Sequence, residues 1–167
     1  MIALLQKIEQ RIDALLQPIV VLGMLALIGV ITLQIISRVF FNAVPWTEEI
    51  ARFLLIWITF LGATLAFQRG RHIAVNLVVD ALPQTLARFT KIVACIIVLA
   101  FMVSLILIGY QYMQVQSFQK SPSLRWSMLY IYAVMPISAS LMLLYAVIDL
   151  LELITNPKSA KPNESSL

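Results

Sequence analysis

The stretch IVACIIVLAFMVSLILIGYQYMQVQSFQ, residues 92–119, contains no Asp, Glu, Lys, Arg or His. About 20 apolar residues in a helix cross the hydrocarbon core of a bilayer, where only helices and closed barrels satisfy every backbone polar group. The stretch therefore predicts a membrane-spanning helix. The runs 18–37 and 126–148 share its lack of charge. With flanking residues included, the three predicted spans cover about 18–40, 89–119 and 125–151.

The composition of the whole chain agrees with a membrane location. Hydrophobic residues make up 61% of the 167 residues and charged residues only 12%, a balance outside the range of soluble domains. A chain of this length holds about four spans and leaves no room for a separate soluble domain. We expect an all-α integral membrane protein in which residues 1–155 form a single four-span domain.

A further span is predicted from the stretch PWTEEIARF, residues 45–53, which leads into an uncharged run. Pro45 suits the first turn of a helix, Thr47 can cap it, and Glu48 and Glu49 lie at the positive end of the helix dipole. These features predict a helix over 45–69 whose charged first turns lie among lipid headgroups.

Proline inside the last span predicts a kink. Pro136 removes one backbone N–H from the helix, and a nearby hydroxyl can satisfy the carbonyl that this frees. Ser138 and Ser140 follow closely in the sequence and are candidates for that contact.

Two amphipathic segments are predicted to lie on the membrane surface as interfacial helices. Residues 1–17 alternate apolar and charged positions at helical spacing. Residues 71–84 do the same, and their polar stripe includes His72, Asn76 and Asp80.

Four spans place both termini on one side of the membrane, and the basic residues predict which side. Eight of the twelve Lys and Arg residues fall in the amino-terminal segment, the connection between the second and third spans, and the carboxyl-terminal tail. The positive-inside rule therefore predicts that both termini are cytoplasmic and that residues 45–53 face outward. The tail, residues 156–167, is polar and rich in Pro and Ser, so we expect it to be disordered. The net charge of +4 suits contact with anionic lipid and gives no reason to expect nucleic acid as a partner.

The chain lacks the usual chemical motifs of enzymes and transport sites. Cys95 is its only cysteine and His72 its only histidine, so neither a disulfide nor a histidine-based metal site is expected. Phosphate-binding glycine loops, zinc-protease motifs and nucleophile elbows are missing from the sequence. The uncharged runs 18–37, 92–119 and 126–148, which form the central parts of the other three spans, hold no Asp, Glu, Lys, Arg or His for a coupling ion. We expect no cofactor or metal in this chain and no transport by it alone.

A helical wheel of the span over 45–69 separates a small, partly polar face from a bulky one. With Glu48 at zero, an arc of about 100° holds a set that we name the small-residue seam. The seam includes Glu48, Arg52, Thr59, Gly62, Ala63, Ala66 and Gly70. Small residues four apart let a second helix approach closely, and Glu48 and Arg52 can pair at i, i+4. The seam predicts a helix contact.

Three other interpretations of these charges stay open at this point. Glu48, Glu49 and Arg52 can simply anchor the helix end among headgroups, as Trp46 does. Glu48 and Glu49 can act as acid and base in a small membrane enzyme. The face with Glu48 can also line a homo-oligomeric channel.

The block from Arg38 to Asn76 resembles the small membrane subunit, DctQ type, of tripartite ATP-independent periplasmic (TRAP) transporters. The matching positions are Arg38, Trp46, Glu48, Glu49, Arg52, Trp57, Phe60, Leu61, Gly62, Gly70, His72 and Ile73, with Asp80, Leu82 and Pro83 beyond the block. Asn76 departs from the pattern, because the family often has Asp there. The chain length and the four predicted spans also fit.

This resemblance implies a role in sodium-driven secondary uptake of organic acid anions, of dicarboxylate or sialic-acid type. In such systems a soluble periplasmic binding protein delivers the substrate, and a large elevator subunit carries the substrate and sodium sites. The small subunit scaffolds the large one and helps to form the docking surface. We therefore expect a multi-pass subunit of the bacterial inner membrane with the large subunit, the binding protein and lipid as partners.

The resemblance and the wheel together assign candidate roles to three groups of residues. The small-residue seam would face the large subunit. Candidates for periplasmic docking are Arg38, Trp46, Glu49, Lys120 and Arg125. The candidates for a cytoplasmic interface are His72, Asn76 and Asp80.

Overall fold

The computed structural model describes residues 2–40, 44–79 and 84–155. Its helices are α1 (Ile2–Phe40), α2 (Pro45–Val79), α3 (Gln84–Gln116), α4 (Met128–Tyr132) and α5 (Val134–Thr155). Over these residues the only β pairing is one isolated bridge between Lys120 and Ser127. The all-helical class predicted from the sequence is confirmed.

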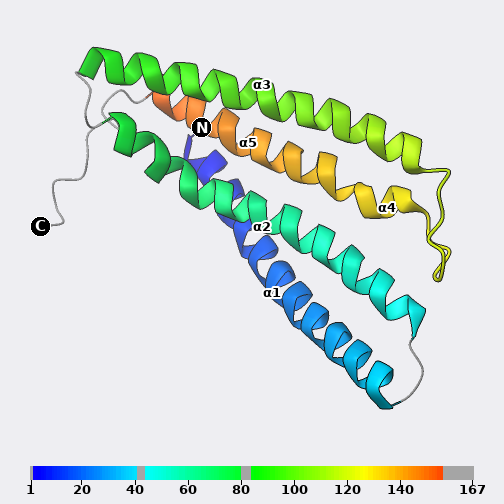
Figure 1. Cartoon of the computed structure of the whole chain (residues 1–167). Coiled ribbons are helices and arrows are strands. Elements are labelled where there is room, and N and C mark those ends of the chain that lie inside the picture. The colour runs from blue at the N-terminus through cyan, green and yellow to red at the C-terminus, as the bar shows by residue number, and fades with distance from the viewer. Residues whose placement is uncertain (1, 41–43, 80–83, 156–167) are drawn as a thin grey trace, which may run out of the picture.

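Four stretches of the described chain are long and apolar enough to cross a membrane. They are Glu9–Phe40, Pro45–Gly70, Phe89–Gln116 and Met128–Leu151. They overlap the four predicted spans, and the predicted number is therefore confirmed. Figure 1 shows the start of α1 and the end of α5 toward the same end of the molecule, as an even number of crossings requires.

Two helix boundaries predicted from the sequence are absent from the structure. The predicted surface helix 1–17 and the span 18–40 form one continuous helix, α1, which runs through Pro18. Likewise α2 continues through Gly70 to Val79, beyond residue 69, where the helix was predicted to end. Helix growth is cooperative, and one internal glycine costs only about 1 kcal/mol, so Gly70 does not end α2. An internal proline costs about 3 kcal/mol, and α1 nevertheless continues through Pro18. Of the predicted interfacial helix 71–84, residues 71–79 belong to α2, and 80–83 lie outside the described residues, as does the tail 156–167.

The predicted kink in the last span takes the form of a break between two helices. Helix α4 ends at Tyr132 and α5 begins at Val134, with Ala133 between them. Pro136 is then the third residue of α5, a first-turn position where the missing N–H costs little. The hydroxyl of Ser140 donates to the carbonyl of Pro136 at 2.7 Å. The predicted serine contact therefore exists, but on the proline's own carbonyl.

The helices form two antiparallel pairs that meet along α2 and α5 (Figure 1). Helix α1 packs on α2, and α3 packs on α5. The buried cluster at the junction consists of Leu16, Leu61, Leu65 and Val134. One glycine permits close approach within each pair. A Cβ on Gly23 would lie 3.0 Å from Cγ1 of Ile58, and a Cβ on Gly109 would lie 3.4 Å from Cβ of Met135.

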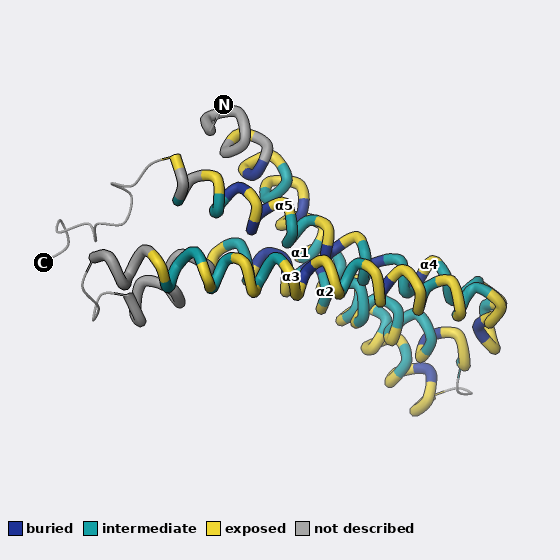
Figure 2. Tube along the Cα trace, turned by 90° about the horizontal axis from the view of Figure 1, so that it is seen from above, coloured by how far each residue is buried: buried dark blue, intermediate teal, exposed yellow. Residues whose placement is uncertain are grey.

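Much of the apolar surface of α1 faces away from the other helices. None of the residues in its most apolar window is buried by the chain. Figure 2 shows this helix largely exposed along the part that diverges from α2 and α5. In a membrane such a surface contacts lipid or another membrane protein.

Candidate functional site

The small-residue seam on α2 is uncovered in the structure. The side chains of Glu48, Arg52, Thr59, Ala63 and Ala66 are exposed. The opposite face of α2 supplies the buried residues Leu61, Thr64 and Leu65. The small face of the helical wheel therefore coincides largely with the exposed face of α2, and the partner that covers it stays a prediction.

The glycines of the seam differ in their surroundings from the glycines at helix contacts within the chain. A Cβ built on Gly62 or Gly70 meets no atom within 4 Å. The corresponding Cβ on Gly23 or Gly109 meets a neighbouring helix of the same chain. Gly62 and Gly70 thus leave room for a close helix contact that the chain itself does not make.

Glu48 and Arg52 form the predicted ion pair at the start of the seam. The Nη2 atom of Arg52 lies 3.0 Å from Oε1 of Glu48, and the two side chains are 65% and 66% exposed. Exposed pairs of this kind contribute at most about 1 kcal/mol to folding. The pairing of Glu48 with Arg52 matters more if the seam is buried in the membrane or against a partner helix. There an unpaired charge would be costly, because water no longer solvates it.

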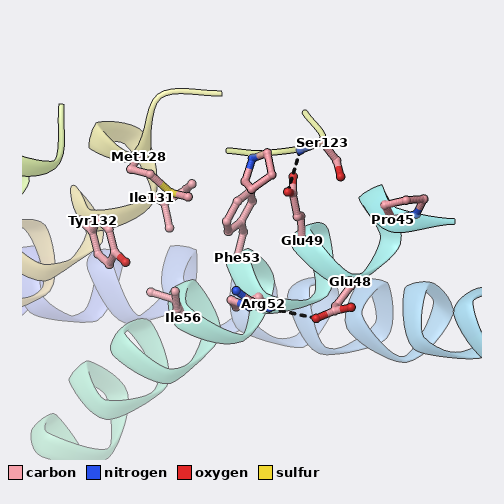
Figure 3. A pocket seen from close by; sticks show the side chains of 11 residues that line it. Pro45, Glu48, Glu49, Arg52, Phe53, Ile56, Ser123, Met128, Ile131 and Tyr132 are labelled. Carbon is pink, nitrogen blue, oxygen red and sulfur yellow. Dashed lines mark hydrogen bonds and ion pairs between the residues drawn. The ribbon is translucent and has the colours of Figure 1, made fainter. Parts of the chain in front are cut away.

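Glu49, although next to Glu48 in the chain, points to the loop between α3 and α4. Its Oε1 accepts the backbone N–H of Ser123 at 2.8 Å, and its Oε2 accepts that of Leu124 at 3.1 Å. The hydroxyl of Ser121 donates to the same Oε2. We name these three hydrogen bonds the Glu49 clip (Figure 3 shows the bond to Ser123). The clip ties the first turn of α2 to a segment more than 70 residues later in the chain.

The α3–α4 loop, residues 117–127, is closed by its own backbone. Ser121 N–H donates to Trp126 O at 2.8 Å, Arg125 N–H donates to Ser121 O at 3.0 Å, and Met128 N–H donates to Gln119 O at 3.0 Å. Arg125 adopts φ 55°, the left-handed region that non-glycine residues rarely occupy. The loop is therefore a defined turn with one strained residue, and its backbone and Ser121 are hydrogen-bonded to the carboxylate of Glu49.

The residues predicted to dock a partner divide into two kinds. The side chains of Arg38, Trp46, Lys120 and Arg125 are exposed. Glu49 is half-buried, and both its oxygens accept hydrogen bonds within the chain. We therefore interpret Glu49 as the support of the α3–α4 loop, a role that sequence reasoning missed because no local pattern links residues so far apart.

A cleft of about 300 Å³ lies between the start of α2, the α3–α4 loop and α4 (Figure 3). Glu48, Glu49 and Arg52 lie on its wall. Phe53 and Tyr132 provide aromatic surface, and Met128 and Ile131 come from α4. Sequence reasoning missed the residues from α4, because they reach the cleft only through tertiary packing.

At the opposite end of the bundle, polar contacts tie the first part of α1 to its neighbours. Gln68 Nε2 donates to Glu9 Oε1 at 3.1 Å, and the hydroxyl of the buried Tyr145 donates to Asp13 Oδ1 at 3.1 Å. The predicted cytoplasmic residues His72 and Asn76 lie in α2, but their side chains, like Asp80, lie outside the described residues. Across the described ranges, no group of three or more His, Cys, Asp or Glu side chains is arranged to hold a metal.

A family model described as "Tripartite ATP-independent periplasmic transporters, DctQ component" matches residues 27–156. The match includes α2, the seam, the Glu49 clip and the cleft. The chain belongs to this family. It is a TRAP small permease subunit of DctQ type, a multi-pass protein of the inner membrane, and the enzyme interpretation of Glu48 and Glu49 is excluded because its relatives are permease subunits.

Two relatives illustrate the range of this DctQ family. The chain is 34% identical over 143 residues to the "Isethionate TRAP transporter permease protein DctMQ" of Oleidesulfovibrio alaskensis, covering 80% of this chain and 22% of the relative. It is 33% identical over 117 residues to the "Sialic acid TRAP transporter small permease protein SiaQ" of Vibrio cholerae, covering 69% of this chain and 65% of the relative. The chain thus spans only part of the length of each.

Proposed function

We propose that this DctQ-type chain scaffolds the large membrane subunit of a TRAP transporter through the small-residue seam of α2. The observation that carries the proposal is the open space at Gly62 and Gly70. Exposed small residues at helical spacing suit a partner helix, because membrane helices associate through close backbone packing. The DctMQ relative supports this assignment, since this chain matches only 22% of a much longer permease protein.

The α3–α4 loop is proposed to form part of the docking surface for the periplasmic binding protein. Lys120 and Arg125 extend from it, and Arg38 and Trp46 lie at the ends of α1 and α2 that adjoin residues 41–43. The arrangement suits docking because the loop is held in one conformation by the Glu49 clip. In this proposal both termini are cytoplasmic and the loop is periplasmic, as the positive-inside rule predicts.

The complete transporter is proposed to carry an organic acid anion with sodium. The names of two relatives, for isethionate and sialic acid, support this substrate class. Across the described residues no group of three or more His, Cys, Asp or Glu side chains is arranged to hold a cation, which favours assigning the sodium and substrate sites to the large subunit.

Co-purification tests the scaffold. The tagged chain is expressed at low level in its native host and extracted in mild detergent as wild type, as Gly62→Leu and as Gly29→Leu. Gly29 is the matched control, because its Cβ also meets open space but lies on α1. We expect wild type and Gly29→Leu to recover the large subunit, and Gly62→Leu to recover about tenfold less. A stable wild-type chain with no large partner would contradict the proposal and favour the homo-oligomeric channel.

A further inference from the structure

The cleft beside the Glu49 clip has an uneven distribution of charge. Two carboxylates, Glu48 and Glu49, and one guanidinium, Arg52, line it, so its wall carries one net negative charge. Glu49 is held only by neutral donors. Arg52 reaches only Oε1 of Glu48, and Oε2 accepts no hydrogen bond from any described residue. The cleft therefore has an acceptor oxygen and a negative charge to offer.

The rest of the lining is apolar and aromatic. Phe53 and Tyr132 present ring surface, and Figure 3 shows Ile56, Met128, Ile131 and Tyr132 on the side of the cleft away from Glu48 and Glu49. Aromatic faces attract ammonium and guanidinium groups, and this attraction is strongest where water is excluded. An apolar floor beneath a charged rim suits a long side chain that lies along hydrocarbon and ends in a cation.

The volume sets the size of the occupant. A space of about 300 Å³ lies at the lower limit of small-molecule pockets. One long side chain fits this space, whereas a helix or a folded loop does not. The position supports the same conclusion, because Glu48 and Arg52 belong both to the cleft and to the small-residue seam.

From these observations we propose that the cleft receives one lysine or arginine side chain of the large membrane subunit. Its alkyl stem lies over Ile56 and Ile131, and its cation bonds Oε2 of Glu48. The proposal rests on the scaffold function above and adds a charged anchor to it. Such an anchor sets the position of the partner helix along α2, which small residues alone leave free to slide.

Photo-crosslinking in the assembled complex tests the occupant. Phe53 is replaced by p-benzoylphenylalanine in the tagged chain, membranes of the native host are irradiated, and the adducts are identified by mass spectrometry. We expect an adduct to a large-subunit peptide that has a Lys or Arg within two residues of the attachment point. The control places the same probe at Leu107, which is 60% exposed on α3. We expect the Leu107 probe to give no such peptide. Adducts to lipid alone at position 53, or to a partner segment without Lys or Arg, would overturn the proposal.

A pair of neutralising variants tests the sign of the occupant's charge. We expect Glu48→Gln to lower recovery of the large subunit about tenfold in a salt-washed pull-down, because the partner's cation loses its acceptor. Arg52→Gln removes the competing cation, so we expect recovery to change less than about twofold. The reverse order of effects would overturn the proposal and indicate an acidic side chain in the cleft. Recovery by wild type and its loss in Gly62→Leu report on the scaffold separately, so the two proposals can fail independently.

Discussion

The backbone N–H of Ser123 lies 2.8 Å from Oε1 of Glu49, although 74 positions separate the two residues in the sequence. The neighbouring Glu48 makes its ion pair with Arg52 on the other side of the helix turn. Two adjacent carboxylates of a DctQ-type sequence therefore have different partners. One supports a loop, and the other remains at an uncovered surface.

Replacing Glu49 by Gln should loosen the α3–α4 loop. The amide nitrogen of Gln cannot accept the N–H groups of Ser123 and Leu124, so at least one of these bonds is lost. Hydrogen exchange of the complex in nanodiscs should show these two amides exchanging on the order of tenfold faster. Arg52→Gln is the control, because that side chain bonds Glu48 and makes no hydrogen bond to the loop. Unchanged exchange in Glu49→Gln would show that the clip is not needed.

Arg125→Gly should tighten the same loop. Arg125 has φ 55°, a region that costs a side chain about 1 to 2 kcal/mol and glycine almost nothing. Slower exchange of the Ser121 amide, which donates to Trp126 O, is the expected readout. Arg125→Val should act in the opposite direction, since a β-branched residue tolerates positive φ least. Equal exchange of the Ser121 amide in the wild type, Arg125→Gly and Arg125→Val would show that the backbone at Arg125 is not strained.

Gly23→Leu should destabilise the subunit itself. Even the Cβ atom of a larger residue at this position would lie 3.0 Å from Cγ1 of Ile58, and the rest of the leucine side chain has less room still. Overpacking of this kind costs about 1 to 3 kcal/mol of folding stability. Thermal unfolding of the purified chain in detergent measures the change. Gly62→Leu should leave that transition unchanged, because its Cβ meets open space. A similar loss in both variants would mean that the seam is covered within the chain.

Tyr145→Phe should weaken the attachment of α1 to α5. The Tyr145 hydroxyl is fully buried and donates to Asp13 at 3.1 Å, and removing one partner of a buried hydrogen bond costs about 1 to 3 kcal/mol. The measurement is again thermal unfolding in detergent. Tyr110→Phe is the matched control, because Tyr110 is 54% exposed on α3. Identical unfolding of the two variants would remove any structural role for the Asp13 contact.

Local patterns in the sequence predicted the spans and the two faces of α2. Uncharged runs such as 92–119 leave few structures possible in a bilayer, and the wheel placed Gly62 and Ala66 together on the small face. The seam was accessible to prediction because helical periodicity links residues three and four positions apart.

The Glu49 clip and the cleft required the tertiary structure. Ser121 and Tyr132 reach α2 only after α3 and α5 have packed, and no sequence period encodes that distance. The helix ends predicted at 17 and 69 differ from those of the structure for another reason, although the apolar span itself does end at Gly70. A change from apolar to amphipathic pattern marks a change of surroundings, while the backbone of α1 and α2 continues without interruption.

The long sequence separation within the Glu49 clip also has a consequence for biogenesis. Glu49 leaves the ribosome and inserts with α1 and α2 well before residues 121–124 are synthesised. The clip can form only after α3 has inserted and the α3–α4 loop has reached the membrane surface where Glu49 lies. Its closure therefore reports a late stage of membrane insertion, at which the first and second halves of the chain become joined.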